Sequence, residues 1–310
     1  MASVDRSGLL LVDKPAGPTS FDVVQRVRRA LQVKKAGHTG TLDPNASGLL
    51  PICLGEATRL VPFLVAGAKS YRGVVRLGAT TDTLDAQGRF LSTRDPSGVT
   101  RASVEAALAT MVGTQEQMPP MFSAKKVGGR RLHELARAGE EIERKPVAVT
   151  IEEARLEAFA PPEVTVFIRC SKGTYVRVLA ADLGERLGCG AHLAQLRRLS
   201  SGPFSVESAT ALAEIERDPT AAAVLPIETA LAHLPELELD ERAAISVSFG
   251  NPLTPADRSR LRLPALASGA LARLTGPSHR VVAVGEADPS GGVRLARVLL
   301  ARTGPGLHRR

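Results

Sequence analysis

The sequence contains no tryptophan, two tyrosines and eight phenylalanines among its 310 residues. Proteins that bind single-stranded nucleic acid without sequence preference, and sheet-based RNA-binding proteins, depend on aromatic side chains on which bases stack. The scarcity of aromatic side chains argues against both classes. A nucleic-acid partner would have to be recognised through its phosphates, its shape and a few placed residues.

Cysteines are also few, and the three that occur are isolated: Cys53, Cys170 and Cys189. The sequence has no CxxC motif and no His/Cys cluster at metal-ligand spacing, so neither a disulfide framework nor a zinc site is indicated. We expect these cysteines to be small buried hydrophobic residues, and we expect no metal.

Long hydrophobic runs are missing too. The N-terminus offers only "LLLV" after "MASVDRSG", which is too short for the apolar part of a signal peptide, and no later run approaches a membrane span. We therefore expect a cytoplasmic protein with no membrane partner.

The net charge is +8, and it is unevenly distributed along the chain. Residues 14–38 hold six Lys/Arg and one acid, residues 210–241 hold one Arg and eight acids, and residues 257–310 hold ten Arg and three acids. Two basic parts separated by an acidic one suit a polyanionic partner, although such a charge can also serve solubility alone. The length favours one large domain with a smaller companion.

The stretch "GLLLVDKPAGPTSFDVVQRVRRALQ" predicts a strand, a Pro/Gly turn and a helix with Thr19 or Ser20 as its N-cap. Arg26 and Arg29 lie away from the apolar face of this helix and are free to face solvent or RNA. The expected apolar face consists of Val23, Val24, Val27, Ala30 and Leu31.

Two further strands carry polar residues of interest. "SYRGVVRLG" alternates as a half-buried strand does, and Tyr71 lies at its start, where a side chain can emerge into a cleft. "EVTVFIRC" also alternates, and the helix after the following turn carries Arg177 one position off its apolar face, pointing back toward the strand ends. From the residues alone, Tyr71 also fits a core aromatic and Arg177 a solvated helix residue.

Residues 114–150 combine a double proline, a double glycine and many charges with little apolar material. They fit either a mobile basic insertion or an ordinary solvated helical hairpin. Beyond the acidic part, "AAISVSFGNPLTP", "GALARLTG" and "RVVAVGEA" predict short strands separated by Gly/Pro turns, which favours a small β-rich C-terminal domain.

"GHTGTLDPNASGLL" places His38 and Asp43 in a run of small polar residues. Pro44 pushes Asp43 into an extended or turn conformation and keeps its carboxylate out of a helix, which fits either a structural turn or a reactive carboxylate. A nucleotide-binding P-loop needs a lysine that does not follow Gly40 or Gly48, and no serine in a nucleophile elbow lies nearby. We expect neither an NTPase nor a serine hydrolase, and no nucleotide cofactor.

Six segments in this order resemble the TruB family of tRNA pseudouridine synthases. The resemblance runs from about Gly8 to Pro203, and the segments are "DKPAGPTSFDVV", "GHTGTLDPNASGLLPICLGEATRL", "KSYRGVVRLGATTDTLDAQG", "PPMFSAKKVGGRRLHELARAG", "CSKGTYVRVLAADLG" and "GAHLAQLRRLSSGPF". The resemblance implies breaking the N-glycosidic bond of a uridine in RNA, turning the uracil over and joining its C5 to the sugar, without a cofactor. It implies that Asp43 is the catalytic carboxylate, paired with Arg177, and that Tyr71 stacks on the target base.

The same resemblance implies further substrate contacts. Leu196 matches an apolar residue lining the uracil pocket, and His38 a histidine that fills the space left when the uridine flips out. Lys14, with Pro15, matches a pair supporting the active-site floor. The basic insertion corresponds to a segment that clamps RNA through Lys125, Lys126, Arg130 and Arg131.

The sequence therefore predicts an α+β pseudouridine synthase fold with a mixed, mostly antiparallel sheet and helices around a cleft. The catalytic domain should span residues 1–235, with the clamping insertion at about 120–150, and a β-rich PUA-like domain should span 236–310. The expected substrate is the T-loop uridine of tRNA, at the position that the family numbers 55, acted on by a monomer. Two alternatives stay open, a non-catalytic tRNA-folding chaperone and a subunit of an RNA-guided pseudouridylase.

Overall fold

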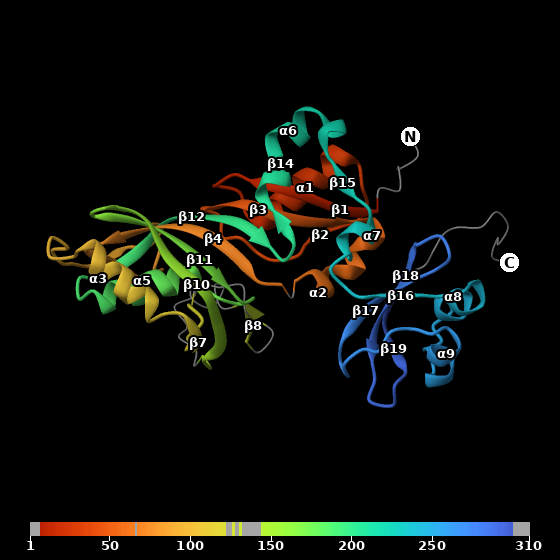
Figure 1. Ribbon diagram of the computed structural model, residues 1–310. Helices are drawn as coiled ribbons and strands as arrows, with labels where there is room; N and C mark the ends of the chain where they lie inside the picture. Colours follow the sequence, from red (N-terminus) through yellow and green to blue (C-terminus); the bar gives the residue numbers. More distant parts are fainter. Residues whose placement is uncertain (1–6, 66, 122–125, 128–129, 132–143, 300–310) are drawn as a thin grey trace.

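The computed structural model describes residues 7–65, 67–121, 126–127, 130–131 and 144–299, with the backbone alone for 126–127 and 130–131. Figure 1 shows one extended, twisted sheet with helices packed on it, and a smaller β-rich unit formed by the C-terminal part of the chain. This is the mixed α/β arrangement with a β-rich C-terminal domain that the sequence predicts.

Within these residues the large sheet has eleven strands, eight of them in the order β14-β1-β3-β12-β4-β11-β10-β7. Neighbours along this path are antiparallel, except that β12 runs parallel to β3 and β14 parallel to β1. The eight strands are β1 (Gly8–Lys14), β3 (Ala46–Leu54), β4 (Lys69–Leu77), β7 (Gly113–Gln117), β10 (Val147–Ala160), β11 (Glu163–Cys170), β12 (Ala191–Ser201) and β14 (Thr210–Ala211).

Shorter elements complete the sheet and connect its strands. Three short strands pair with it at the side: β2 (Ala36–His38), β13 (Phe204–Ser205) and β15 (Val224–Leu225). Two hairpins form separate two-stranded sheets: β5 (Ala79–Thr81) with β6 (Phe90–Thr93), and β8 (Lys126–Val127) with β9 (Arg130–Arg131). The short helical turns are η1 (Gly55–Leu60), α2 (Val61–Leu64), η2 (Val206–Ser208), η3 (Pro219–Ala221) and α7 (Ile227–Ala230).

Helix α1 (Ser20–Leu31) begins as the sequence predicts. Thr19 is the N-cap, its side chain accepts from the backbone N–H of Asp22, and the Asp22 carboxylate accepts in return from the Thr19 backbone. This reciprocal pair satisfies two of the free donors at the helix start. The predicted apolar face is confirmed, with all its valines and Leu31 buried.

Arg26 lies off the apolar face of α1 as predicted, and its side chain is 40% exposed, but it is paired with an acid. Its guanidinium forms two hydrogen bonds with Glu216 of α6 (Leu212–Arg217), Nε to Oε1 at 2.6 Å and Nη2 to Oε2 at 2.5 Å. The acid comes from the acidic part of the chain, which folds back onto the first basic part. Counting charges along the sequence could not show this neutralisation.

The remaining helices of the catalytic part cover the sheet in two groups. Helices α3 (Arg101–Ala109) and α5 (Val176–Arg186) pack on the half of the sheet that contains β10, β11 and β12, while α1 and α6 lie at the β1 end. A single hydrophobic cluster runs beneath both groups and includes Val24, Ile52, Val75 and Leu183. The core thus fixes α5 against β12, next to the loop that carries Asp43.

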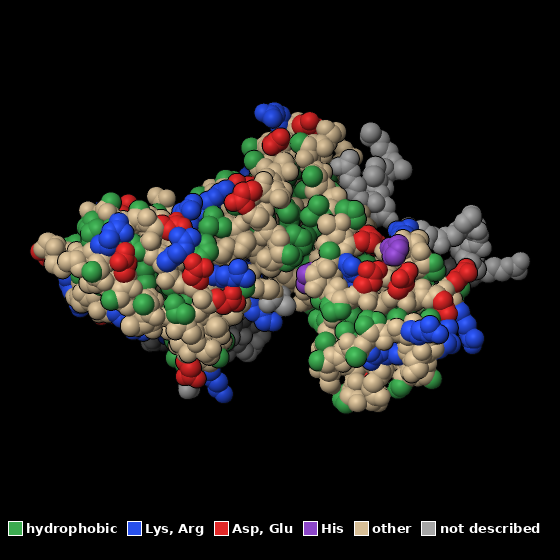
Figure 2. All heavy atoms as spheres, viewed as in Figure 1, with side chains coloured by type: hydrophobic (Ala, Val, Ile, Leu, Met, Phe, Trp, Pro, Cys, Tyr) green, Lys and Arg blue, Asp and Glu red, His purple; other side chains and the backbone are tan. Residues whose placement is uncertain are grey.

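The C-terminal unit has its own sheet, in the order β16-β17-β18-β19, and its own hydrophobic cluster. Figure 2 shows Lys and Arg side chains gathered over its helices, although Arg260 is hydrogen-bonded to Asp240. The elements are β16 (Glu236–Glu238), α8 (Glu241–Ser248), α9 (Pro255–Arg260), β17 (Leu271–Thr275), β18 (Val281–Ala287) and β19 (Val293–Val298).

The strands expected in "GALARLTG" and "RVVAVGEA" are confirmed as β17 and β18, but "AAISVSFG" is not a strand. It lies in α8, because the Asp240 side chain accepts from the Ala243 N–H at 2.8 Å and caps a helix. Ala243 and Val247, four residues apart, then share the buried helix face. No helix among the described residues is long and apolar enough to cross a membrane.

Candidate active site

The Asp43 loop, defined here as residues 39–45, connects β2 to β3 and is held mainly through its backbone. Lys14, fully buried at the end of β1, donates from Nζ to the Pro44 carbonyl at 2.9 Å and to the Ala46 carbonyl at 2.6 Å. Ser20, at the start of α1, donates to the Leu42 carbonyl and accepts from the Leu42 N–H, each at 2.8 Å. These bonds fix the residues on both sides of Asp43, which supports the predicted role of Lys14 beneath the site.

Arg198 of β12 holds the same loop from the other side. Its guanidinium is 1% exposed and donates to three backbone carbonyls, those of Leu49 at 2.7 Å, Gly40 at 3.2 Å and Thr41 at 3.4 Å. A buried guanidinium needs acceptors for its donors, and here the loop supplies them. Sequence reasoning did not single out Arg198, because two adjacent arginines in a strand carry no signal of which one points inward.

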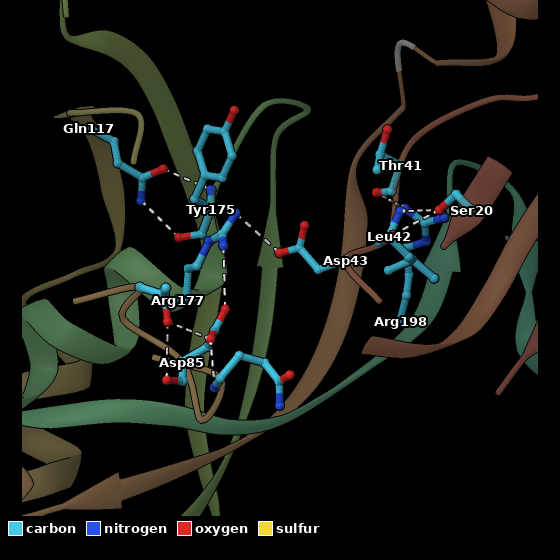
Figure 3. Close-up of polar contacts among 11 residues, drawn as sticks. Ser20, Thr41, Leu42, Asp43, Asp85, Gln117, Tyr175, Arg177 and Arg198 are labelled. Atoms are coloured by element: carbon cyan, nitrogen blue, oxygen red, sulfur yellow. Dashed lines mark hydrogen bonds and ion pairs between the residues drawn. The ribbon is translucent and has the colours of Figure 1, made fainter. Parts of the chain in front are cut away.

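The carboxylate of Asp43 faces Arg177, the second residue of α5. Arg177 Nη2 lies 3.2 Å from Asp43 Oδ2, and Arg177 Nη1 lies 3.4 Å from Asp85 Oδ2. Figure 3 shows the guanidinium of Arg177 between the two carboxylates. Arg177 is 6% exposed, so it is not the solvated helix residue that composition alone allowed.

Asp85 was missed by the sequence analysis. It follows Leu84, whose φ is +65°, in the turn between β5 and β6. Its Oδ1 accepts from the Thr83 hydroxyl at 2.7 Å and from the Gln87 N–H at 3.0 Å, which leaves Oδ2 toward Arg177. Its position beside Arg177 depends on tertiary packing of that turn against β12, where Asp85 pairs with Leu193.

The pKa of Asp43 is raised above its ordinary value, and the largest cause is desolvation by burial. The side chain is nevertheless 48% exposed, so protein surrounds the carboxylate while solvent still reaches it from one side. Arg177 and Lys14 act in the opposite direction and lower this pKa, whereas Asp85 raises it. The carboxylate is thus accessible to a ligand and its charge depends on the cations next to it.

Tyr71 lies on β4 directly opposite Arg198 in the strand pairing. The side chain is 7% exposed and belongs to the main hydrophobic cluster, so it forms a wall of the site and does not project into a cleft. Burial raises the pKa of its hydroxyl, and the positive charge of Arg198 partly offsets that effect. The hydroxyl is therefore protonated at neutral pH.

His38 of β2 and Leu196 of β12 lie along the same edge of β3, opposite β1, with His38 beside Ile52 and Leu196 beside Ala46. His38 Nδ1 accepts from the Gly40 N–H at 3.3 Å, and burial followed by the charge of Arg198 lowers the pKa of the imidazole, which favours its neutral form. Leu196 pairs with Ala46 across the parallel β12–β3 contact and packs, partly buried, on the main cluster. Both predicted residues thus border the Asp43 loop.

The side chains of the four predicted clamp residues lie outside the part of the chain that the structure describes. Lys125 lies outside the described residues, and Lys126, Arg130 and Arg131 are described by their backbone alone, in the β8–β9 hairpin. Their RNA-binding role stays a prediction. In the part of the chain that the structure describes, no group of three His, Cys, Asp or Glu could hold a metal ion.

Comparison with protein families matches two adjacent parts of the chain. Residues 28–176 match the TruB family pseudouridylate synthase N-terminal domain, and residues 177–232 match the tRNA pseudouridylate synthase B C-terminal domain. The chain belongs to the TruB family of pseudouridylate synthases. As a member of this family it is a pseudouridine synthase, an isomerase.

The matches to relatives within the family cover nearly the full length of those relatives. The tRNA pseudouridine synthase B of Geobacillus kaustophilus (strain HTA426) is 50% identical over 282 residues, covering 87% of this chain and 95% of the relative. That of Burkholderia pseudomallei (strain 668) is 45% identical over 291 residues, covering 93% and 95%. The family resemblance inferred from the motifs is thereby confirmed.

Solved structures agree on the fold. The crystal structure of a Cbf5-Nop10-Gar1 complex contains a chain 25% identical, with a TM-score of 0.75, covering 96% of this chain and 86% of that one. The archaeal box H/ACA sRNP Nop10-Cbf5 complex gives 25% identity and a TM-score of 0.70, covering 96% and 87%. The predicted fold class is confirmed, while the division at residue 235 and the PUA-like character of the C-terminal unit stay predictions.

Proposed function

We propose that this TruB-family enzyme converts the T-loop uridine of tRNA, position 55 in the family's numbering, to pseudouridine, with Asp43 as the catalytic carboxylate. The observation that carries the proposal is the Arg177–Asp43 pair at 3.2 Å, in which an almost fully buried cation meets a half-exposed carboxylate. The names of the relatives support tRNA as the substrate class.

The reaction is an isomerisation and needs no oxidant and no second substrate. The bond between N1 of the uracil and C1′ of the ribose breaks, the uracil turns, C5 bonds to C1′, and the hydrogen on C5 leaves as a proton while N1 gains one. Asp43, as nucleophile or general base, must be ionised to take part. Arg177 and Lys14 favour that charged form, against the desolvation that opposes it.

The target uridine has to leave its stack to reach Asp43, which costs a few kcal/mol. His38 and Leu196, next to the Asp43 loop, are the proposed contacts for the opened RNA loop and for the uracil. Tyr71 is the proposed aromatic contact with the base, from the wall of the site. A chain with so few aromatic residues depends on such placed contacts and on phosphate binding, so activity should fall steeply with added salt.

The test uses a T-arm stem-loop that carries tritium at C5 of its uridines, because forming pseudouridine releases this hydrogen to water. Wild type should release about one tritium per loop, as the reaction's stoichiometry requires, and Asp43→Asn should release none at verified equal RNA binding. Release by Asp43→Asn would refute the role of Asp43. If wild type binds the stem-loop but releases no tritium, either the T-loop uridine is not the substrate or the protein is a non-catalytic tRNA-folding chaperone.

The structural similarity to chains in Cbf5 complexes is a reason to test the alternative of an RNA-guided pseudouridylase subunit. The same assay decides it, since the chain is used alone, without a guide RNA or protein partners. Multiple turnover on the stem-loop by the isolated chain would exclude a dependence on guides. Activity that appears only when a guide RNA and partner proteins are added would favour the alternative.

A further inference from the structure

Gln117, the last residue of β7, binds the backbone of Tyr175 at both of its polar groups. Its side-chain Nε2 donates to the Tyr175 carbonyl at 3.2 Å, and its Oε1 accepts from the Tyr175 N–H at 2.8 Å. The side chain is 4% exposed, so water competes little for these bonds. Figure 3 shows this pair directly beside Arg177.

Tyr175 occupies a critical place in the chain, because it is the N-cap of α5. The helix has no side-chain cap of its own. The Tyr175 carbonyl also accepts from the N–H groups of Val178 at 3.1 Å and Leu179 at 3.3 Å. Gln117 therefore anchors the start of the helix by binding both backbone polar groups of its N-cap residue, while the N–H groups of the first turn receive no side-chain cap.

That first turn contains Arg177, two residues after Tyr175. The Arg177 guanidinium lies 5.8 Å from the centre of the Tyr175 ring, within the range of a cation–π contact. Its contacts with Asp43 at 3.2 Å and with Asp85 at 3.4 Å are already near the upper limit of hydrogen-bonding distance. A displacement of the first turn by about 1 Å would take both beyond hydrogen-bonding distance.

We propose that Gln117 is a positioning residue for pseudouridine formation, which acts through Tyr175 to hold Arg177 against Asp43. This inference rests on the proposed role of Asp43. It differs from a purely structural role for Gln117, which would stabilise α5 without affecting the charge of the reacting carboxylate.

The two roles differ in the pH dependence they predict. Among the residues that the structure describes, the charged and titratable groups facing Asp43 are Arg177 from α5, Asp85 from the β5–β6 turn, Lys14 from β1 and Tyr71 from β4. Of these, only Arg177 depends on Gln117 for its place. Since Arg177 lowers the pKa of Asp43, loosening it should raise that pKa, so that activity is lost at a higher pH on the acidic side.

The first variant is Gln117→Met, which keeps the length of the side chain and removes both hydrogen bonds. The second is Gln117→Asn, which stays polar but withdraws the amide by one carbon and disturbs the packing less. Gln115→Met is the matched control, because Gln115 lies two residues earlier on the same face of β7 and is partly exposed. Folding of each variant is checked by thermal unfolding before its kinetics are measured.

With the tritium-release assay on the stem-loop, both Gln117 variants should lose about 10- to 100-fold in kcat, the scale expected for misplacing a catalytic contact by about 1 Å. KM should change little, and the acidic limb of the pH profile should move to higher pH. Gln115→Met should behave like wild type. An unchanged acidic limb in folded Gln117→Met or Gln117→Asn would overturn the proposal.

A double variant gives an independent readout. In an Arg177→Lys background the guanidinium fork is already lost, so adding Gln117→Met should reduce kcat far less than it does in wild type. Full additivity of the two effects would also overturn the proposal. Asp43→Asn separates the failure of the proposed function from the failure of the positioning role. If Asp43→Asn stays active, the proposed function fails. If Asp43→Asn is inactive but the Gln117 variants are as active as wild type, only the positioning role of Gln117 fails.

Discussion

The guanidinium of Arg177 joins Asp43 and Asp85, two carboxylates from different loops, at 3.2 Å and 3.4 Å. Arg177 is the first residue of the part that matches the family's C-terminal domain, and both carboxylates lie in the part that matches its N-terminal domain. The Asp43–Arg177–Asp85 cluster is therefore assembled only when the two matched parts of the chain pack together.

Replacing Arg177 by lysine should reduce kcat by about 10²- to 10³-fold, as the loss of one preorganised charge contact does in other enzymes. A lysine keeps the positive charge but cannot reach two carboxylates with a planar fork. Tritium release under single turnover, with RNA binding measured separately, checks this expectation. Equal activity of Arg177→Lys and wild type would show that charge alone is sufficient.

Asp85→Asn should shift the acidic limb of kcat/KM in the direction opposite to the Gln117 variants. The charge of Asp85 raises the pKa of Asp43, so its removal lowers that pKa and extends activity to lower pH. The pH profile of tritium release between pH 4 and 8 is the measurement, and a shift to higher pH would contradict the assigned electrostatics.

Gly48→Ala should destabilise the protein by at least about 2 kcal/mol, the scale of a strained backbone conformation. Gly48 has a φ of +97°, and a Cβ there would overlap the Arg198 carbonyl and lie 2.8 Å from the Arg198 backbone nitrogen. Gly98→Ala is the control, because nothing lies within 4 Å of a Cβ at that position. Chemical unfolding of both variants gives the two free energies, and equal values would refute the close β3–β12 contact.

Because Lys69 is buried, it should make the free energy of unfolding increase as the pH rises from about 8 to 10.5. Burial lowers its pKa from 10.5 to about 8, so between these values the unfolded chain binds a proton that the folded chain does not. Stability from this group is therefore gained as the pH rises through about 8. Unfolding of Lys69→Met should show a shallower rise between pH 8 and 10, whereas Lys172→Met, at an exposed position, should follow wild type.

Much of the fold was predictable because hydrophobic periodicity is a local property. The alternation in "SYRGVVRLG" correctly predicted the buried and exposed faces of β4, and the valines of α1 are buried as expected. The strand expected at "AAISVSFG" is a helix, since the cap supplied by Asp240 outweighs the β-branched residues. Capping decides between two patterns that a short apolar run cannot distinguish.

The sequence by itself determined the family and the loop that carries Asp43, because these follow from the order of the motifs, and it indicated Arg177 as the partner of Asp43 only through the family resemblance. Only the tertiary structure decided that Asp85 shares Arg177, that Arg198 binds the carbonyls of the Asp43 loop and that Gln117 binds the backbone of the N-cap residue of α5. The physical reason is that each of these contacts joins residues far apart in the sequence. A polar side chain shows its partner only when folding buries it and a hydrogen bond must replace the water it has lost.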